Sequence, residues 1–200
     1  MFRVFVEEIP SVYLCCDTLI TAEDVASASR FQNERRRAEH LAWRRMVRRE
    51  LGRDVHIDYN AVGAPVVDSP DTWIGVSHSK DVVAVAIADE MVGIDIEYKD
   101  RDFEHAKSRY MSPEEEMLSS DSLWTAYMWT AKEAMYKLYG RRGVELRDDL
   151  RVESFDSTTM TMRGTLAGDS RRALIAVELR EEEIIVAVAT FEKFNNIVVG

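Results

Sequence analysis

The stretch from Leu123 to Leu138 carries the pattern that most constrains the fold of this 200-residue chain. At 100° per residue, its large apolar side chains gather on one broad arc of a helix, so this arc is predicted to face a core. We expect the helix to begin with Asp121 or Ser122 as N-cap and to end before Gly140, which favours a left-handed terminus. The arc consists of Leu123, Trp124, Tyr127, Met128, Ala131, Ala134, Met135 and Leu138.

A second stripe on the same predicted helix combines an indole, a carboxylate and an ammonium. Trp129, Glu133 and Lys137 recur at intervals of four residues and therefore share one face. On a solvated helix the Glu–Lys pair contributes only about 0.2–0.5 kcal/mol, and a tryptophan more often packs than binds a ligand. The stripe alone leaves a structural and a functional interpretation open.

The other elements follow from caps and apolar runs. Residues 82–88 and 92–98 are apolar runs around a short polar break, which predicts a β-hairpin. Thr21 with Asp24 and Ser112 with Glu115 form capping-box patterns that mark helix starts. Further elements are predicted as a helix over 33–51 ending at Gly52, and strands over 152–155, 159–166, 173–179 and 184–191.

The run at 92–98 carries two carboxylates on one face. Strand side chains alternate, so Asp95 and Glu97 point together away from the core that Ile94 and Ile96 face. Two such carboxylates repel each other unless positive charge lies between them. Oxygen ligands suit a hard cation, and Mg²⁺ commonly takes one or two protein carboxylates while keeping positions for water and phosphates. Glu133 is a third carboxylate that can close such a magnesium site.

Three motifs in order carry a family resemblance. The chain contains Ser-His-Ser at 77–79, Gly-Ile-Asp-Ile-Glu at 93–97 and Trp-x-x-Lys-Glu-Ala-x-x-Lys at 129–137. This order resembles the 4′-phosphopantetheinyl transferases, specifically the larger surfactin-type branch. The match spans roughly residues 30 to 140, and three motifs in sequence are far more specific than one. The resemblance implies an α+β fold of two similar halves, 1–99 and 100–200, related by a pseudo-two-fold axis with the ligand cleft between them.

The resemblance also implies an activity. Such an enzyme moves the phosphopantetheine arm of coenzyme A to a serine of an acyl or peptidyl carrier protein and releases 3′,5′-ADP. Asp95, Glu97 and Glu133 would hold Mg²⁺ against the pyrophosphate, and Glu133 is the first candidate for the base that takes the serine proton. The catalytic residues are thus expected to be Glu133 and Lys137. The residues expected to bind coenzyme A are His40, Arg37, Ser77, His78, Lys132 and Lys137.

One departure concerns position 64. Relatives often show Gly-Lys-Pro ahead of the Ser-His-Ser motif, whereas this chain has Gly-Ala-Pro at 63–65. The missing cation puts affinity for coenzyme A in question without touching the metal site. Arg37 or Arg44, at helical spacing from His40, are the candidates to replace it. Ala64 also favours an alternative, a non-catalytic module that binds coenzyme A or a carrier protein.

Charge is unevenly distributed along the chain. Residues 30–53 contain nine arginines against three glutamates, a net charge of +6, which leaves −16 for the remainder of a chain of net charge −10. One interpretation is a solvated helix face paired with acidic neighbours. Another is a basic surface that steers coenzyme A and an acidic carrier protein. Nucleic-acid binding, a third class, is opposed by the overall acidity and by the scarcity of stacking aromatics beyond Phe31 and Trp43.

Location and assembly follow from composition. No apolar run approaches the roughly 20 residues that span a bilayer, and the first residues do not form a basic segment followed by an apolar block. Adjacent Cys15 and Cys16 are too close for an ordinary disulfide, so a reduced pair in or beside a strand is predicted. We expect a cytoplasmic monomer with neither membrane nor nucleic-acid partners, because one chain supplies both halves of the expected cleft.

Overall fold

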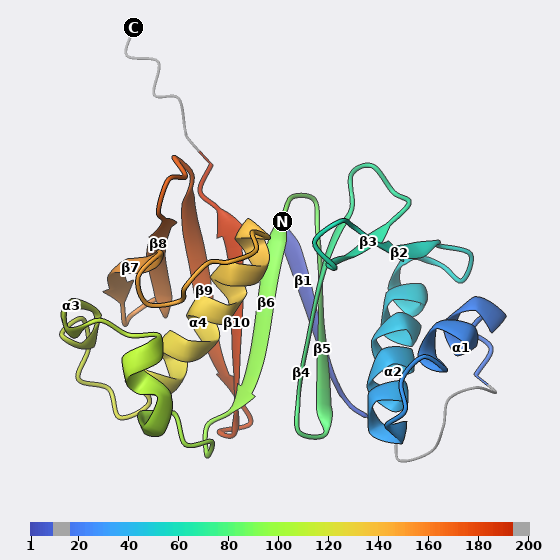
Figure 1. The fold of residues 1–200 in the computed structure, drawn as a ribbon, viewed down its shortest axis with the longest axis horizontal. Helices are drawn as coiled ribbons and strands as arrows, with labels where there is room; N and C mark the ends of the chain where they lie inside the picture. Colours follow the sequence, from blue (N-terminus) through green and yellow to red (C-terminus); the bar gives the residue numbers. More distant parts are fainter. Residues whose placement is uncertain (10–16, 194–200) are drawn as a thin grey trace, which may run out of the picture.

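The structure, a computed structural model, describes residues 1–9 and 17–193 and shows the predicted mixed α+β class (Figure 1). Cys15 and Cys16 lie outside the described residues. A short 3₁₀ helix occupies Glu104–Arg109. The elements are β1 (Phe2–Glu8), α1 (Ala22–Ala28), α2 (Glu34–Leu51), β2 (Ile57–Tyr59), β3 (Pro65–Val67), β4 (Trp73–Ser79), β5 (Val82–Ala88), β6 (Val92–Tyr98), α3 (Pro113–Glu116), α4 (Trp124–Tyr139), β7 (Leu150–Asp156), β8 (Thr161–Leu166), β9 (Arg172–Arg180) and β10 (Ile184–Phe191).

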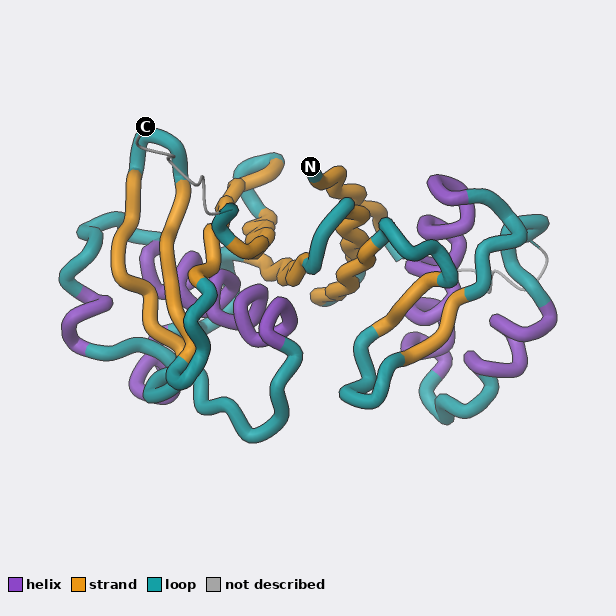
Figure 2. The backbone as a smooth tube through the Cα atoms, turned by 90° about the horizontal axis from the view of Figure 1, so that it is seen from above, coloured by secondary structure: helices purple, strands orange, loops and turns teal. Residues whose placement is uncertain are grey.

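Two antiparallel sheets lie between two long helices. The three-stranded sheet has the order β1-β5-β4, and the five-stranded sheet has the order β6-β10-β9-β8-β7. Figures 1 and 2 show α4 beside the five-stranded sheet and the α1–α2 pair at the opposite end of the molecule. Strands β2 and β3 form a separate small hairpin. The layers therefore run α4, five-stranded sheet, three-stranded sheet, α2.

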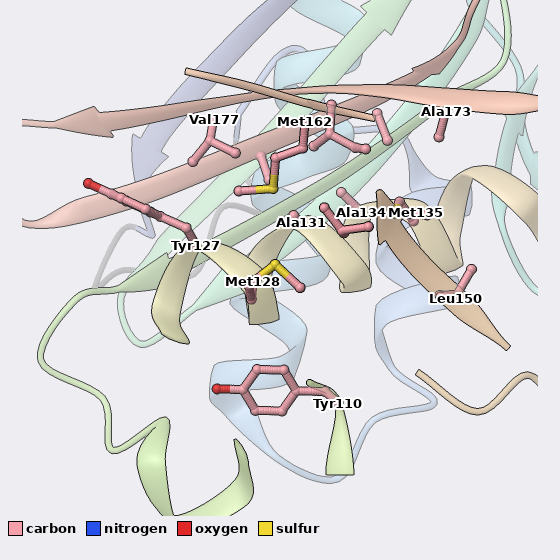
Figure 3. Packing of buried hydrophobic residues seen from close by; sticks show 14 of the residues in the cluster. Tyr110, Tyr127, Met128, Ala131, Ala134, Met135, Leu150, Met162, Ala173 and Val177 are labelled. Atoms are coloured by element: carbon pink, nitrogen blue, oxygen red, sulfur yellow. The ribbon is translucent and has the colours of Figure 1, made fainter. Parts of the chain in front are cut away.

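Hydrophobic side chains fill each boundary between these layers. Alternate residues of β5 face opposite layers: Val83 and Val85 pack against α2, whereas Ala84 and Ala86 pack against β6 and β10. Strand β10 behaves in the same way, which is why both runs are apolar at nearly every position. Figure 3 shows the third boundary, where Ala131, Ala134 and Met135 of α4 meet the five-stranded sheet.

The predicted hairpin of residues 82–88 with 92–98 is wrong. Both strands form, but β5 pairs with β1 and β4, whereas β6 pairs with β10. A strand has only two hydrogen-bonding edges, and the neighbours of β5 already occupy both. The chain therefore crosses from one sheet to the other between β5 and β6. Strand β6 precedes residue 99 but joins a sheet of C-terminal strands. The division into two halves after residue 99 stays a prediction.

Helix α4 approaches β6 closely because Gly93 has no side chain. A Cβ atom at this position would lie 2.6 Å from the backbone nitrogen of Leu138 and would collide with the carbonyl oxygen of Ala134. Gly75 plays a weaker part on the other side, where an added Cβ would lie 3.0 Å from a methyl group of Ile94. Strand β6 is thereby held against α4 and beside β4, which brings three elements together at one place.

The helix boundaries largely follow the predicted caps. Thr21 and Asn33 are the N-caps of α1 and α2, and Gly140 ends α4 in the left-handed conformation. The expected start of α4 is one to two residues early, since Leu123 occupies its N-cap position without a side-chain cap. Asp121 instead accepts a hydrogen bond from the Leu123 nitrogen in the preceding turn.

A membrane-crossing helix would need both length and sustained apolar character. No helix within the described residues combines the two.

We predict that Gly93→Ala destabilises the protein by about 1–3 kcal/mol, because a methyl group there must displace the backbone of α4. Gly75→Ala is the matched comparison, since its added methyl meets a side-chain methyl that can shift. Urea unfolding of both variants measures the two effects. Equal stability of Gly93→Ala and the unsubstituted protein would show that the contact between β6 and α4 is not tight.

Candidate active site

The polar side chains of β6 lie under helix α4. Asp95 and Glu97 are both buried on the face of β6 opposite Ile94 and Ile96, as the strand alternation predicts. Across from them, α4 presents the Trp129–Glu133–Lys137 stripe. The two segments are far apart in sequence. The absence of a side chain at Gly93 lets them lie close together in space.

Lys137 is the bridge between these segments. Its Nζ donates to Asp95 Oδ1 at 2.8 Å, to Ser77 Oγ at 2.9 Å and to the carbonyl oxygen of Ile94 at 2.9 Å. All three ammonium donors are therefore used. Ser77 Oγ donates to Asp95 Oδ1 at 2.8 Å, whereas Asp95 Oδ2 is buried without a hydrogen-bond partner among the described residues.

Glu97 has a separate set of partners. Its Oε1 accepts a hydrogen bond from Trp129 Nε1 at 3.2 Å and an ion pair from Arg101, and its Oε2 accepts from Ser79 Oγ at 2.6 Å. The Arg101 guanidinium also lies 4.8 Å from the centre of a Trp129 ring. The sequence analysis did not assign this role to Ser79 or Arg101. Ser79 could have been found from strand alternation, because it lies two residues after Ser77 and therefore on the same face of β4.

Glu133 lies in the same cluster with a perturbed carboxyl group. Burial raises its pKa, Asp95 and Glu97 add to the rise by charge repulsion, and Lys137 and Arg101 oppose it. Within residues 1–9 and 17–193, Glu133 makes no side-chain hydrogen bond or ion pair. A carboxylate with a raised pKa and no partner is available both as a base and as a ligand.

These residues fit a divalent cation chemically, although they are not arranged as a finished metal site. Among the described residues, no group of three or more His, Cys, Asp or Glu side chains stands in a metal-holding arrangement. Two cationic side chains, Lys137 and Arg101, hold Asp95 and Glu97 instead. The unpartnered Asp95 Oδ2 and the repulsion that raises the pKa of Glu133 are both features that a hard cation would relieve.

The Ser77–His78 pair is divided between the two faces of β4. Ser77 points to Asp95, whereas His78 points toward α2, where its Nε2 lies 2.7 Å from Arg36 and 3.8 Å from Glu39. Burial lowers the pKa of His78, and Glu39 opposes this effect. The two residues thus line different spaces, one beside the carboxylates and one beside the arginine-rich helix.

His40 lines a small cavity of about 160 Å³ on that second side, together with Phe31, Trp43 and Tyr59. It is 5% exposed, and its Nε2 has no hydrogen-bond partner among the described residues. Burial, reinforced by the charge of Arg44, lowers the pKa of His40 to about 4. His40 is therefore neutral at pH 7 and can offer a hydrogen bond, but no positive charge, to a ligand.

The two arginines expected to replace the cation missing at position 64 are occupied. Arg44 is buried and donates to Asp24 Oδ1 at 2.9 Å, so its guanidinium is engaged inside the fold. Arg37 is exposed, donates to the carbonyl oxygen of Phe31 at 2.6 Å and does not line this small cavity. The compensation expected of Arg44 or Arg37 stays a prediction.

The other arginines of α2 favour the ion-paired interpretation of this helix. Arg35 and Arg36 pair with Glu39, whereas Arg48 joins Arg44 on Asp24. Arg45 pairs with Asp17 and Glu7. Arg49 pairs with Glu7 and Glu50.

Lys132 was predicted to bind coenzyme A, but its side chain lies in the core. Its ammonium is fully buried, donates to Glu115 at 2.8 Å and also to the carbonyl oxygens of Leu146 and Leu150. Glu115 in turn accepts from the backbone nitrogen of Val152. Consecutive residues of a helix point about 100° apart, so Glu133 faces the cleft while Lys132 faces the core. Lys132 ties α4 to α3 and β7 and does not reach the Asp95–Glu97 cluster.

A larger cavity of about 260 Å³ lies next to Lys137. Its walls come from the loop before β3, from β4 and β6, and from the C-terminal end of α4. The residues that line it include Gly63, Ala64, Pro65, Tyr136, Lys137, Arg141 and Arg142. A ligand in this cavity would contact both halves of the molecule and would have Lys137 and its carboxylate partner at one end.

One family model matches the C-terminal part of the chain. Residues 91–189 match the 4′-phosphopantetheinyl transferase superfamily (ACPS). This stretch forms a domain of that superfamily and contains Asp95, Glu97, Glu133 and Lys137, whereas Ser77 and His78 precede it. No curated protein matches the chain.

We predict that Lys132→Met destabilises the protein by about 3–5 kcal/mol, because it leaves the Glu115 carboxylate buried without a counter-charge. Adding Glu115→Gln to this variant removes the stranded charge and restores part of the stability. Urea unfolding of the single and double variants measures both effects. A stable Lys132→Met protein that binds phosphate ligands poorly would reverse our assignment of Lys132.

His40 predicts a pH dependence of stability. Its pKa is about 4 in the fold against 6.5 for an ordinary histidine, so the unfolded chain binds more protons between these values. Titration of His40 therefore does not change the free energy of unfolding above pH 6.5. Between pH 6.5 and 4 it lowers the free energy of unfolding by up to about 3 kcal/mol. Unfolding curves for His40→Gln should fall less steeply over this window. Parallel curves for the two proteins would contradict the buried, neutral state.

Proposed function

We propose that this chain, whose residues 91–189 form a domain of the 4′-phosphopantetheinyl transferase superfamily, is itself such a transferase. It would move the phosphopantetheine arm of coenzyme A to a serine of an acyl or peptidyl carrier protein and release 3′,5′-ADP. The observation that carries the proposal is the convergence of Asp95, Glu97, Glu133 and Lys137 beside a cavity formed by both halves. A structural helix face gives no reason to gather three carboxylates, two of them buried, at one place.

We propose Mg²⁺ as the cofactor, held by Asp95, Glu97 and Glu133. The support is the unpartnered Asp95 Oδ2 and the mutual repulsion that raises the pKa of Glu133. When bound, the ion would neutralise charge on the pyrophosphate oxygens. If the ion replaced Lys137 on Asp95 or Arg101 on Glu97, the displaced side chain would be free to bind a phosphate oxygen.

The residues of the chain suggest how the reaction proceeds. The serine oxygen of the carrier protein forms a bond to the β-phosphorus of coenzyme A, and the bond between that phosphorus and the bridging oxygen breaks. The serine proton passes to the Glu133 carboxylate, and 3′,5′-ADP leaves with the bonding electron pair. A raised pKa makes Glu133 a stronger base than a solvated glutamate. Lys137 holds Asp95 in place and supplies positive charge to the departing 5′-phosphate of 3′,5′-ADP.

The cavity of about 260 Å³ is the proposed place for the nucleotide end of coenzyme A. Ser77 is next to its Lys137 wall, and His40 and His78 lie beyond Val76, which lines both cavities. His40 and His78 would then contact a phosphate as hydrogen-bonding groups, His40 in neutral form. Arg37 stays a proposal without a contact to either cavity.

The finer classification is also proposed. Each long helix covers one sheet, α2 the three-stranded and α4 the five-stranded one, with the cavity at the boundary. This supports the surfactin-type branch with two similar halves, 1–99 and 100–200, about a pseudo-two-fold axis. Since one chain supplies both walls of the cavity, a monomer suffices, and its proposed substrates place it in the cytoplasm.

The test uses the full chain with coenzyme A, Mg²⁺ and an apo carrier protein, and weighs the carrier for the added arm. Glu133→Gln should lower turnover at least 100-fold while leaving the fold intact, because the amide can neither take the proton nor bind a cation as a carboxylate. Glu178→Gln, an exposed glutamate on β9, is the control.

The outcomes separate the two function classes. Turnover by Glu133→Gln close to that of the control would remove Glu133 from the mechanism. Coenzyme A binding by the unsubstituted chain without transfer to any of several carriers would favour the non-catalytic binding module.

A further inference from the structure

The large cavity has an unusual balance of charge. Three cationic residues, Lys137, Arg141 and Arg142, line it, and none of its lining residues is acidic. This contrasts with a chain that carries a net charge of −10. A cavity with basic walls in an acidic protein is suited to an anionic ligand.

Only one of these three cations has no acidic partner within the described residues. Lys137 is paired with Asp95 at 2.8 Å, and Arg141 with Asp169 at 2.8 Å. Arg142 instead donates from Nη2 to the carbonyl oxygen of Ala61 at 3.1 Å. This neutral partner leaves the charge of Arg142 uncompensated and leaves other N–H donors of its guanidinium for a ligand.

The backbone explains how Arg142 reaches the cavity. Gly140 ends α4 with φ of 59°, and this left-handed turn directs the next residues away from the helix axis. The hydrogen bond to Ala61 then joins this turn to the β2–β3 loop on the other wall. Arg142 thus spans the cavity mouth between the two halves of the molecule.

The end of α4 makes this cation important. The last carbonyl groups of a helix carry partial negative charge, which repels an anion. Lys137 is already held by three acceptors, so its charge is shared with the carboxylate. A phosphate at this end of the cavity therefore needs another positive group.

We propose that Arg142 is a phosphate-binding residue that anchors the nucleotide portion of coenzyme A at the mouth of this cavity. The choice of coenzyme A as the anion rests on the proposed function, whereas the anion-binding role rests on the cavity itself. A guanidinium can hold a phosphate through two parallel N–H donors, which an ammonium cannot.

The experiment is calorimetric titration of the full chain with coenzyme A in the presence of Mg²⁺. Arg142→Ala should weaken binding about 10-fold or more, the size expected for loss of a charge-assisted hydrogen bond. Arg142→Gln should weaken it similarly, because glutamine keeps a donor for the Ala61 carbonyl but has no charge. Arg142→Lys should recover part of the affinity.

Arg147→Ala is the matched control. Arg147 is an exposed arginine after the same helix, it also donates to a backbone carbonyl, that of Ser108 at 3.2 Å, and it does not line the cavity. Its loss should leave the affinity for coenzyme A unchanged. Wild-type affinity in Arg142→Gln would overturn the proposal, since the arginine would then act only as a tie to the β2–β3 loop.

A relocated charge gives a second, independent readout. Ala64 lines the same cavity from the opposite wall, so Ala64→Lys returns a cation to this space without touching Arg142. Adding Ala64→Lys to Arg142→Ala should restore at least a third of the lost affinity on a logarithmic scale. A loss of affinity in Arg142→Ala that Ala64→Lys does not restore would contradict a role of the Arg142 charge in this cavity.

Titration with inorganic pyrophosphate distinguishes this inference from the proposed function. If the unsubstituted chain binds pyrophosphate but not coenzyme A, and Arg142→Ala abolishes that binding, the anion role stands and the proposed function fails. If coenzyme A binds equally to the unsubstituted chain and Arg142→Ala, only the inference fails. If neither ligand binds the unsubstituted chain, both fail.

Discussion

The contact between strand β6 and helix α4 is the constraint on which the candidate site depends. Gly93 allows the backbone of α4 to lie against the strand, and any side chain there would collide with the Ala134 carbonyl. This closeness lets Lys137 reach Asp95 and Trp129 reach Glu97 from one face of the helix. A helix displaced by the thickness of a methyl group would lengthen both contacts beyond hydrogen-bonding distance.

Adjacent residues of α4 serve opposite purposes because helical side chains diverge. Lys132 enters the core, where Glu115 and two carbonyl oxygens satisfy all of its donors. Glu133 enters the cleft, where burial and like charges raise its pKa. The buried pair therefore holds α4 against α3 and β7, while the neighbouring Glu133 makes no ion pair among the described residues. The site combines a rigid support with a carboxylate that has no fixed partner among the described residues.

Local sequence patterns predicted much of this arrangement. Caps at Thr21, Asn33 and Gly140 were visible because they depend on neighbouring residues alone. The alternation that places Asp95 and Glu97 on one face is equally local. By contrast, the pairing of β5 with β1 and of β6 with β10 was not predictable from these strands, because both partners lie far along the chain. Burial also decided the role of Lys132, which the motif alone assigned to phosphate.

Local patterns in the sequence were enough to locate the long helices and the C-terminal strands, to show which side chains share a face, and to place three acidic residues in motifs that resemble those of one superfamily. These properties depend on the periods of the helix and the strand and on residues a few positions apart. Contacts between distant segments set the pairing of β6 with β10, the ion pair of Arg44 with Asp24 and the hydrogen bond from Arg142 to Ala61. Those outcomes depend on contacts between distant segments, whose free energies come from packing and charge pairing that no local pattern contains.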